Sequence, residues 1–325
     1  MWRHLGEIME TKIKRGKKIK MKWLIIIVIA VIIVIIGFKF SQAEKAARER
    51  FSKYKAKAQS VETSYGTISY IDEGKGEVIL SCHGICGGYD QAYDTLSEKT
   101  ELYRVIAPSR FGYPGSTAPD NPSVDNQVEA FVELLDALEI EKTYVLGTSA
   151  GGATAIKFAL THPERTKGLI LYCSGYPAIE APKKEATYVG PPKVICNDFL
   201  MWFFSPLFGP LMGMDKETVE MIMPLADRKE GIVIDAKISN TVMSNNREAY
   251  DMGDLTVPVL CFHAKDDKLA NYDEAIAWKD LIPNCTFVTF ESGGHMMEGN
   301  GKEIEEFLNR FVNEENFEKT GDMYE

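Results

Sequence analysis

A single serine stands between glycines at alternate positions in the stretch YVLGTSAGGATAIKFA, residues 144–159. Gly147 and Gly151 flank Ser149, an apolar run typical of a strand precedes it, and a helical pattern over 150–162 follows. Glycines let the backbone turn sharply from strand to helix, which exposes the serine hydroxyl and points the helix N-terminal amides at the same place. The pattern predicts a nucleophilic serine; the alternative is a glycine-rich helix start without chemistry.

A serine hydroxyl needs a neighbouring base before it acts as a nucleophile. Histidine is the usual base, and the chain has five histidines. One of them, His295 in the segment ESGGHMME, follows the last predicted strand in a glycine-rich loop, where a mobile, exposed imidazole could reach the serine. The others lie in the charged N-terminal tail, before a glycine turn, at a helix end and inside an apolar strand: His4, His83, His162 and His263. We therefore predict His295 as the base.

The imidazole in turn requires a carboxylate that orients it. The segment HAKDDKLANYDEA begins inside the strand predicted at 257–264, and just after that strand it offers Asp266 and Asp267. Both could instead be helix-capping residues. From the residues alone, either aspartate could be the third member of a catalytic triad.

Apolar runs alternate with helical patterns through most of the chain. Strands are predicted at 65–74, 77–82, 103–109, 142–148, 167–174, 257–264 and 285–292, and helices between them include 124–140 and 150–162. Such alternation predicts an α/β fold with a doubly wound, mostly parallel sheet. The residues between about 176 and 253 lack a clear strand, which favours an inserted helical cap.

The inserted segment contains FLMWFFSPLFGPLMGM, residues 199–214, which is rich in aromatic residues and methionine. Three interpretations stay open: packing of the cap on the core, the wall of an acyl-binding pocket, and a lip that touches a membrane. Pro206, Gly209 and Pro210 argue against a second transmembrane helix.

An uncharged segment, WLIIIVIAVIIVIIGF at 23–38, lies near the N-terminus between lysines. Its sixteen residues span about 24 Å as a helix, and Phe40 with snorkelling lysines extends the predicted transmembrane anchor to 23–40. A signal peptide cleaved after SQA at 41–43 is the alternative. Eight lysines and arginines precede the span, and seven lie just after it, between residues 39 and 57. The positive-inside rule therefore only slightly favours a single-pass protein with an extracytoplasmic catalytic domain.

These patterns divide the chain into six parts. They are a basic tail (1–22), the transmembrane anchor (23–40), a helical or flexible stalk (41–60), an α/β core (61–175 and 254–316), the helical cap (176–253) and a C-terminal tail (317–325). The net charge of −10 argues against nucleic acid as a partner. The six cysteines have no zinc-type spacing, and Cys82, Cys173 and Cys261 lie in apolar runs typical of buried thiols. We expect no metal and no cofactor.

Several segments resemble the α/β-hydrolase superfamily. CHGICGGYDQ (82–91) is similar to its HGxxGGxDQ turn, and APSRFGYPGS (107–116) is similar to the segment after the next strand. GTSAGG, THPER and GGH also match, and the resemblance covers roughly 63–315 without most of the cap. It implies an α/β-hydrolase fold with Ser149 as nucleophile, His295 as base and an acid between them in the chain.

The resemblance also bears on the other site residues. In the family, the acid usually lies three residues after a glycine at the end of this strand. Ala264 stands in place of that glycine here, so the resemblance favours Asp267 over Asp266. The backbone amides of Ile85 and Ala150 are implied to form an oxyanion hole. His83 is then a structural turn residue, and Cys86 stands where many relatives have glycine.

The expected function is that of a membrane-anchored serine hydrolase that cleaves an uncharged or lipid-like carboxylic ester through an acyl-enzyme. A proline-type peptidase, a haloperoxidase-like enzyme and a catalytically silent binding protein share the fold and remain alternatives. A dehalogenase needs an acidic nucleophile, which Ser149 excludes. The expected partners are a small ester substrate and the membrane.

Overall fold

The computed structural model describes residues 2–180, 182–214 and 216–313 and divides into two compact units, with the boundary between Ala46 and Ala47. The C-terminal tail predicted at 317–325 lies outside the described residues.

The first unit belongs to one long helix, α1 (Trp2–Lys55). Its part from Lys20 to Lys55 is long and apolar enough to cross a membrane, and a signal sequence near the N-terminus would meet the same criterion. Most large apolar side chains between Trp23 and Phe38 are exposed. The helix is therefore compatible with a single-pass anchor or with a signal sequence.

The second unit is built on an eight-stranded sheet with the strand order β1-β2-β4-β3-β5-β6-β7-β8. Strands β3 to β8 run parallel, whereas β2 is antiparallel to both of its neighbours. The bounds are β1 (Gln59–Thr63), β2 (Gly66–Gly74), β3 (Glu77–Cys82), β4 (Tyr103–Pro108), β5 (Thr143–Thr148), β6 (Thr166–Tyr172), β7 (Val259–Ala264) and β8 (Cys285–Phe290). The predicted strands and the mostly parallel sheet are confirmed; β1 was not predicted.

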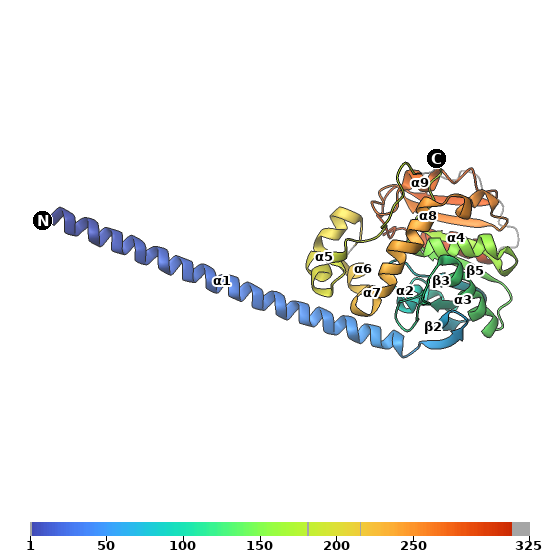
Figure 1. Cartoon of the computed structure of the whole chain (residues 1–325), viewed down its shortest axis with the longest axis horizontal. Helices are drawn as coiled ribbons and strands as arrows, with labels where there is room; N and C mark the ends of the chain where they lie inside the picture. The colour runs from blue at the N-terminus through green and yellow to red at the C-terminus, as the bar shows by residue number, and fades with distance from the viewer. Residues whose placement is uncertain (1, 181, 215, 314–325) are drawn as a thin grey trace. The chain divides into compact units, whose positions relative to one another are not determined.

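Helices cover both faces of the sheet, as a doubly wound fold requires (Figure 1). Neighbouring residues of one strand enter different cores: Val145 packs with α3 and α4, and Leu146 packs with α2 and α10. Both faces of the parallel strands are thus buried, which explains their continuous apolar sequences. The helices are α2 (Tyr89–Asp94), α3 (Val124–Ala137), α4 (Gly152–Thr161), α9 (Tyr272–Ile276) and α10 (Gly301–Asn313).

The described residues of the insertion between β6 and β7 form helices and loops but no strand, as predicted. Its helices are α5 (Asp198–Met212), α6 (Lys216–Met221), α7 (Lys229–Ile234) and α8 (Asn240–Asn245), with a short π-helix, Asp235–Ser239, between the last two. Helix α5 includes Pro206 and Pro210 without ending. Pro206 cannot donate to the Trp202 carbonyl one turn back, and the Ser205 hydroxyl donates to that carbonyl instead, at 2.7 Å.

The last turns of α1 belong to the second unit and are not a free stalk. The Phe51 ring stacks on Tyr89, with 5.9 Å between centroids, and the Tyr54 hydroxyl donates to Asp94 at 2.5 Å. The segment predicted as a stalk at 41–60 therefore splits: the turns from 47 onward contact α2 and the cap, and 59–60 begin β1. The sequence did not show this because a helix with few apolar residues buries only Ala47 and Phe51.

Candidate active site

Ser149 stands at the turn between β5 and α4 with a φ of 51°, in the left-handed region that few side chains adopt. The flanking glycines are required by close packing. A Cβ on Gly147 would lie 2.7 Å from the Ala155 Cβ, and one on Gly151 would overlap the Cys82 carbonyl oxygen. The glycine spacing is therefore the consequence of a bend that leaves no room for side chains and presents the serine at the carboxyl edge of the sheet.

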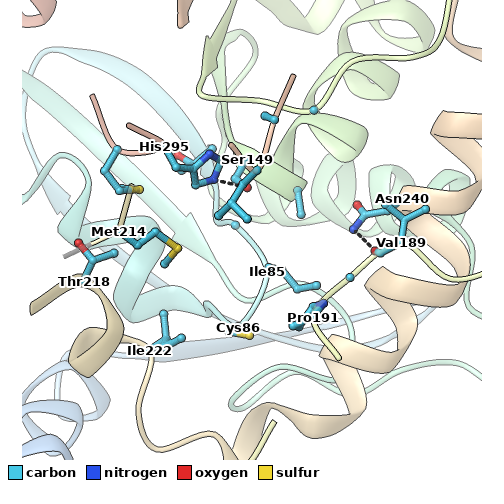
Figure 2. A pocket seen from close by; sticks show the side chains of 18 of the residues that line it. Ile85, Cys86, Ser149, Val189, Pro191, Met214, Thr218, Ile222, Asn240 and His295 are labelled. Carbon is cyan, nitrogen blue, oxygen red and sulfur yellow. Dashed lines mark hydrogen bonds between the residues drawn. The ribbon is translucent and has the colours of Figure 1, made fainter. Parts of the chain in front are cut away.

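The structure brings three predicted residues together. The Ser149 hydroxyl lies 2.9 Å from His295 Nε2, and His295 Nδ1 lies 2.8 Å from Asp267 Oδ2. In Figure 2 the imidazole and the serine point toward each other. With Nδ1–H donating to the carboxylate, Nε2 is free to accept the serine proton.

The two candidate aspartates have different partners. Asp267 bonds the His295 ring, whereas Asp266 accepts hydrogen bonds from the backbone amides of Gly294 at 2.8 Å and Gly293 at 3.3 Å. Asp267 is 8% exposed, and Asp266 is exposed. The geometry places Asp267 at the ring and Asp266 at the backbone of the loop that carries the ring.

The Asp267 carboxylate is stabilised in its ionised form. Burial acts to raise its pKa, but the hydrogen bond from His295 and the backbone amides of Ala270 and Leu269 outweigh it, so the pKa lies below the usual value. A second imidazole, His263, lies 3.4 Å from the same carboxylate oxygen and donates to the Ala270 carbonyl at 2.9 Å. Burial lowers the pKa of His263, which keeps it neutral.

His295 is 4% exposed, so the expectation of an exposed imidazole was wrong. The cap covers it: the His295 amide donates to the carbonyl of Gly213 at the end of α5, at 3.2 Å. Gly213 and Gly294 pack so closely that a Cβ on Gly213 would lie 2.6 Å from the Gly294 Cα. The glycines of this loop serve close packing rather than mobility.

The loop that follows β3 lies directly beside the serine. A Cβ on Gly84 would be 3.4 Å from the Ser149 Cβ, and both Ile85 and Ala150 line the cavity above the hydroxyl. The Gly84 amide is bound to Gln91 Oε1 at 2.9 Å. The next backbone amide in that loop, Ile85 N–H, has no hydrogen-bond partner among the described residues. It is thus available to a bound oxygen.

His83 is a structural residue in this loop. It is fully buried, its Nδ1–H donates to the Gly84 carbonyl at 2.7 Å, and its Nε2 accepts the Arg110 amide at 3.0 Å. Burial and the positive charge of Arg110 lower the pKa of His83 well below its usual value. The ring is a neutral bridge between two loops, not a second base.

Two buried ion pairs tie the same loop to the cap, and sequence reasoning missed both. Arg110 donates to the His83 carbonyl at 2.9 Å and pairs with Asp235 of the π-helix. Arg228, which precedes α7, donates to the Gly87 carbonyl and pairs with Asp90 at 2.7 Å. Arg110 and Asp90 lie in the segments that carry the family resemblance, but nothing in the sequence marked the cap residues.

A cavity of about 550 Å³ opens above Ser149. Its wall is mainly apolar and includes Ile85, Cys86, Met201, Phe208, Met214 and Ile222. Among the described residues that line it, none is lysine or arginine, and Glu274 is the one carboxylate. Burial raises the pKa of the Cys86 thiol, so Cys86 is a protonated part of the apolar wall. The described residues contain no cluster that could hold a metal ion.

Comparisons agree with this architecture. A family model described as alpha/beta hydrolase fold matches residues 77–195. The chain is similar to the uncharacterized hydrolase YcgS of Bacillus subtilis (28% identity; 75% of this chain and 93% of the relative) and to Lipase 3 of Moraxella sp. (25% identity; 69% and 73%). A solved structure of a thermophilic esterase from Thermogutta terrifontis superposes with a TM-score of 0.63 at 22% identity, over 78% of this chain and 99% of that one.

The fold and the site geometry define an α/β-hydrolase-fold protein. Residues 77–195 match the alpha/beta hydrolase fold family model, and the solved structure of the Thermogutta esterase shares the fold over most of the chain.

Proposed function

We propose that this protein is a serine hydrolase that cleaves carboxylic esters through an acyl-enzyme. The observation that carries the proposal is the continuous chain of hydrogen bonds from Ser149 through His295 to Asp267 below an apolar cavity. A serine hydroxyl, a base and an orienting carboxylate within bonding distance are the parts that acyl transfer requires.

The geometry supports a definite sequence of steps. His295 Nε2 takes the Ser149 proton as the oxygen attacks the ester carbonyl, and Asp267 stabilises the imidazolium. The amides of Ile85 and Ala150 bind the oxyanion, each contributing on the order of 3–4 kcal/mol to the transition state. His295 then protonates the leaving alcohol, and water releases the acyl group by the same route.

The cavity supports an uncharged, lipid-like substrate. Its wall is mainly apolar, and the absence of lysine and arginine among the described lining residues gives an anionic acyl chain no partner. The chain is similar in sequence to Lipase 3 and in fold to the Thermogutta esterase, which supports an ester substrate.

The long apolar helix supports membrane attachment. We propose that α1 is retained as a single-pass anchor with the catalytic unit outside the cytoplasm. The exposed aliphatic surface between Trp23 and Phe38 favours a bilayer as its surroundings. The nearly equal positive charge on both sides gives the orientation little support, so it rests on the usual arrangement of N-terminal anchors.

A fluorophosphonate probe separates an enzyme from a silent binding protein. The full chain in mild detergent should be labelled at Ser149 and should hydrolyse p-nitrophenyl esters faster than matched amides. Ser149→Ala should abolish both labelling and turnover. Labelling without ester turnover, or a preference for prolyl amides, would contradict the ester assignment while leaving the nucleophile in place. No labelling would contradict the mechanism itself.

A further inference from the structure

Helix α5 exposes a row of large apolar side chains on its outer face. Four of these side chains recur every four residues, and a fifth is adjacent to one of them. We call this set the α5 outer face: Phe199 (37% exposed), Phe203 (44%), Phe204 (37%), Leu207 (51%) and Leu211 (60%). No charged residue occurs between 199 and 214. The nearest charge, Asp198, turns inward, and its carboxylate accepts the Leu225 amide at 2.6 Å. Such a face is unfavourable in water and suits a hydrocarbon surface.

The opposite face of the same helix belongs to the active site. Met201 and Phe208 are buried and line the cavity. At the end of the helix, the Gly213 carbonyl accepts a hydrogen bond from the His295 amide, and the Lys268 ammonium donates to the Pro210 carbonyl at 3.0 Å. Helix α5 is thus a single layer between the cavity and the surroundings of the protein.

The chain between the apolar segment and its nearest contact with the cap is short. Arg50 donates to two cap carbonyls, those of Glu220 at 2.6 Å and Met223 at 3.2 Å. It follows Phe40, the end of the apolar segment, by ten residues, and ten residues reach at most about 35 Å in any conformation. If the apolar segment spans a membrane, the chain that joins it to this cap contact is therefore at most about 35 Å long.

We propose that the α5 outer face lies in the surface of the lipid bilayer and that lipid-like esters pass from the bilayer into the cavity beside α5. The docking rests on the exposed face and the anchor. The delivery of substrate also rests on the proposed esterase function.

Site-directed spin labelling of the full chain in phosphatidylcholine liposomes tests the docking without any need for activity. Nitroxides are placed at Leu207→Cys and Leu211→Cys, with Cys196→Ser because the other described cysteines are buried. The matched control is Leu102→Cys, an exposed leucine (42%) just before β4, at the amino edge of the sheet and opposite the cap. The ratio of oxygen to nickel-chelate relaxation should be about fivefold higher at the two α5 positions, because oxygen concentrates in the bilayer.

Two outcomes overturn the docking. Free access of the nickel chelate to Leu207 and Leu211 would place the α5 outer face in water. Shielding from both reagents, with spin–spin broadening between chains, would show that a second copy covers it.

The delivery of substrate is tested with Leu207→Ser/Leu211→Ser, which changes no cavity residue. Hydrolysis of a long-chain ester embedded in the liposomes should fall about tenfold, whereas hydrolysis of p-nitrophenyl acetate in the same liposomes should be unchanged. An equal loss on both esters would overturn the delivery. If the unsubstituted chain hydrolyses neither ester, the proposed function fails, and the spin-label ratio still decides the docking.

Discussion

Asp266 and Asp267 are neighbours in the chain, but their carboxylates hold different parts of the histidine loop. Asp267 fixes the tautomer of the His295 ring, so Asp267→Asn should lower kcat for a soluble ester by about 10⁴-fold. Asp266 only accepts hydrogen bonds from two backbone amides, and the side-chain amide oxygen of Asp266→Asn can still accept them. The kcat of this variant should therefore stay within about tenfold of that of the unsubstituted chain. Steady-state kinetics on p-nitrophenyl butyrate measures both.

The double variants provide the control. Combining Asp267→Asn with Ser149→Ala or His295→Ala should cost little beyond the worse single change, because the three residues act as a unit. A harmless Asp267→Asn beside a damaging Asp266→Asn would reverse the assignment of the acid.

His83 makes the stability of the fold depend on pH. Its pKa is about 6.5 when unfolded and well below that when folded, so below pH 6.5 the unfolded chain binds a proton that the folded chain excludes. Stability is therefore retained above pH 6.5 and lost as the pH falls, by about 1.4 kcal/mol per pH unit for this residue. His263, whose pKa is also lowered, acts in the same direction.

Urea unfolding of the detergent-solubilised chain at pH 7.5, 6.0 and 5.0 measures this dependence. His83→Gln should be less stable at pH 7.5 but should lose less stability between pH 6.5 and 5 than the unsubstituted chain. An unchanged slope would mean that His83 does not titrate on unfolding.

At the scale of elements, the sequence predicted those features that depend on local pattern. Strands β3 to β8 have continuous apolar runs because both of their faces are buried, and the Ser149 turn has glycines because its backbone packs too closely for side chains. Each of these patterns lies within a few residues of the sequence. The pair of Arg110 with Asp235 joins residues 125 positions apart, and only the folded cap brings them together. Strand β1 is mostly exposed and offers Val61 as its only large apolar residue, too little for a recognisable pattern.

The Arg110–Asp235 pair connects the cap to the loop beside Ser149. Asp235→Asn would leave the buried Arg110 charge unpaired and should lower the free energy of unfolding by about 3–5 kcal/mol. It should also lower kcat, because Arg110 holds the carbonyls of His83 and Gly84. Unfolding midpoints and ester kinetics measure the two effects.

The exposed pair of Lys167 with Glu77 is the matched control, with side chains 37% and 38% exposed. Glu77→Gln should cost at most about 1 kcal/mol and leave kcat unchanged. Equal costs for both pairs would contradict the special role of the buried one.

Helix α5 combines two of the interpretations left open for its sequence, because its inner face both packs and lines the cavity. Trp202 is only partly buried and does not line the cavity, so Phe208 is the residue to change. Phe208→Ala should lower the free energy of unfolding by about 3–5 kcal/mol. It should also slow the hydrolysis of long-chain esters more than that of short ones, by up to about 0.8 kcal/mol per methylene contact. A series of p-nitrophenyl esters from acetate to laurate measures the preference.

Phe158→Ala is the control for this change. Phe158 is also buried, at 0% exposed against 6% for Phe208, but it packs in the core between the sheet and its helices and does not line the cavity. Its truncation should therefore lower stability without altering chain-length preference. A uniform loss across the series in Phe208→Ala would contradict the lining role.

At the scale of the whole molecule, the last turns of the long helix α1 belong to the unit that carries Ser149, His295 and Asp267. The Phe51 ring lies between Tyr89 and the Arg228 guanidinium, which is 5.3 Å from its centroid. Arg228 also holds the Gly87 carbonyl of the loop beside the serine. The end of α1 is therefore part of the support of the active site, and cleavage after Ala43 would leave it intact.

Two truncated forms separate anchoring from this support. The full chain should remain in the membrane fraction through a high-salt wash, because the apolar span does not depend on charge. A form that begins at Ala47 should be soluble and active. One that begins at Gln59 loses Phe51, Arg50 and Tyr54, and it should be less stable by about 3–5 kcal/mol, the usual cost of removing a buried aromatic ring. Equal stability of the two forms in urea would show that residues 47–58 only tether the second unit. A mature N-terminus at Glu44 in the expressed full chain would show that the apolar span is a cleaved signal.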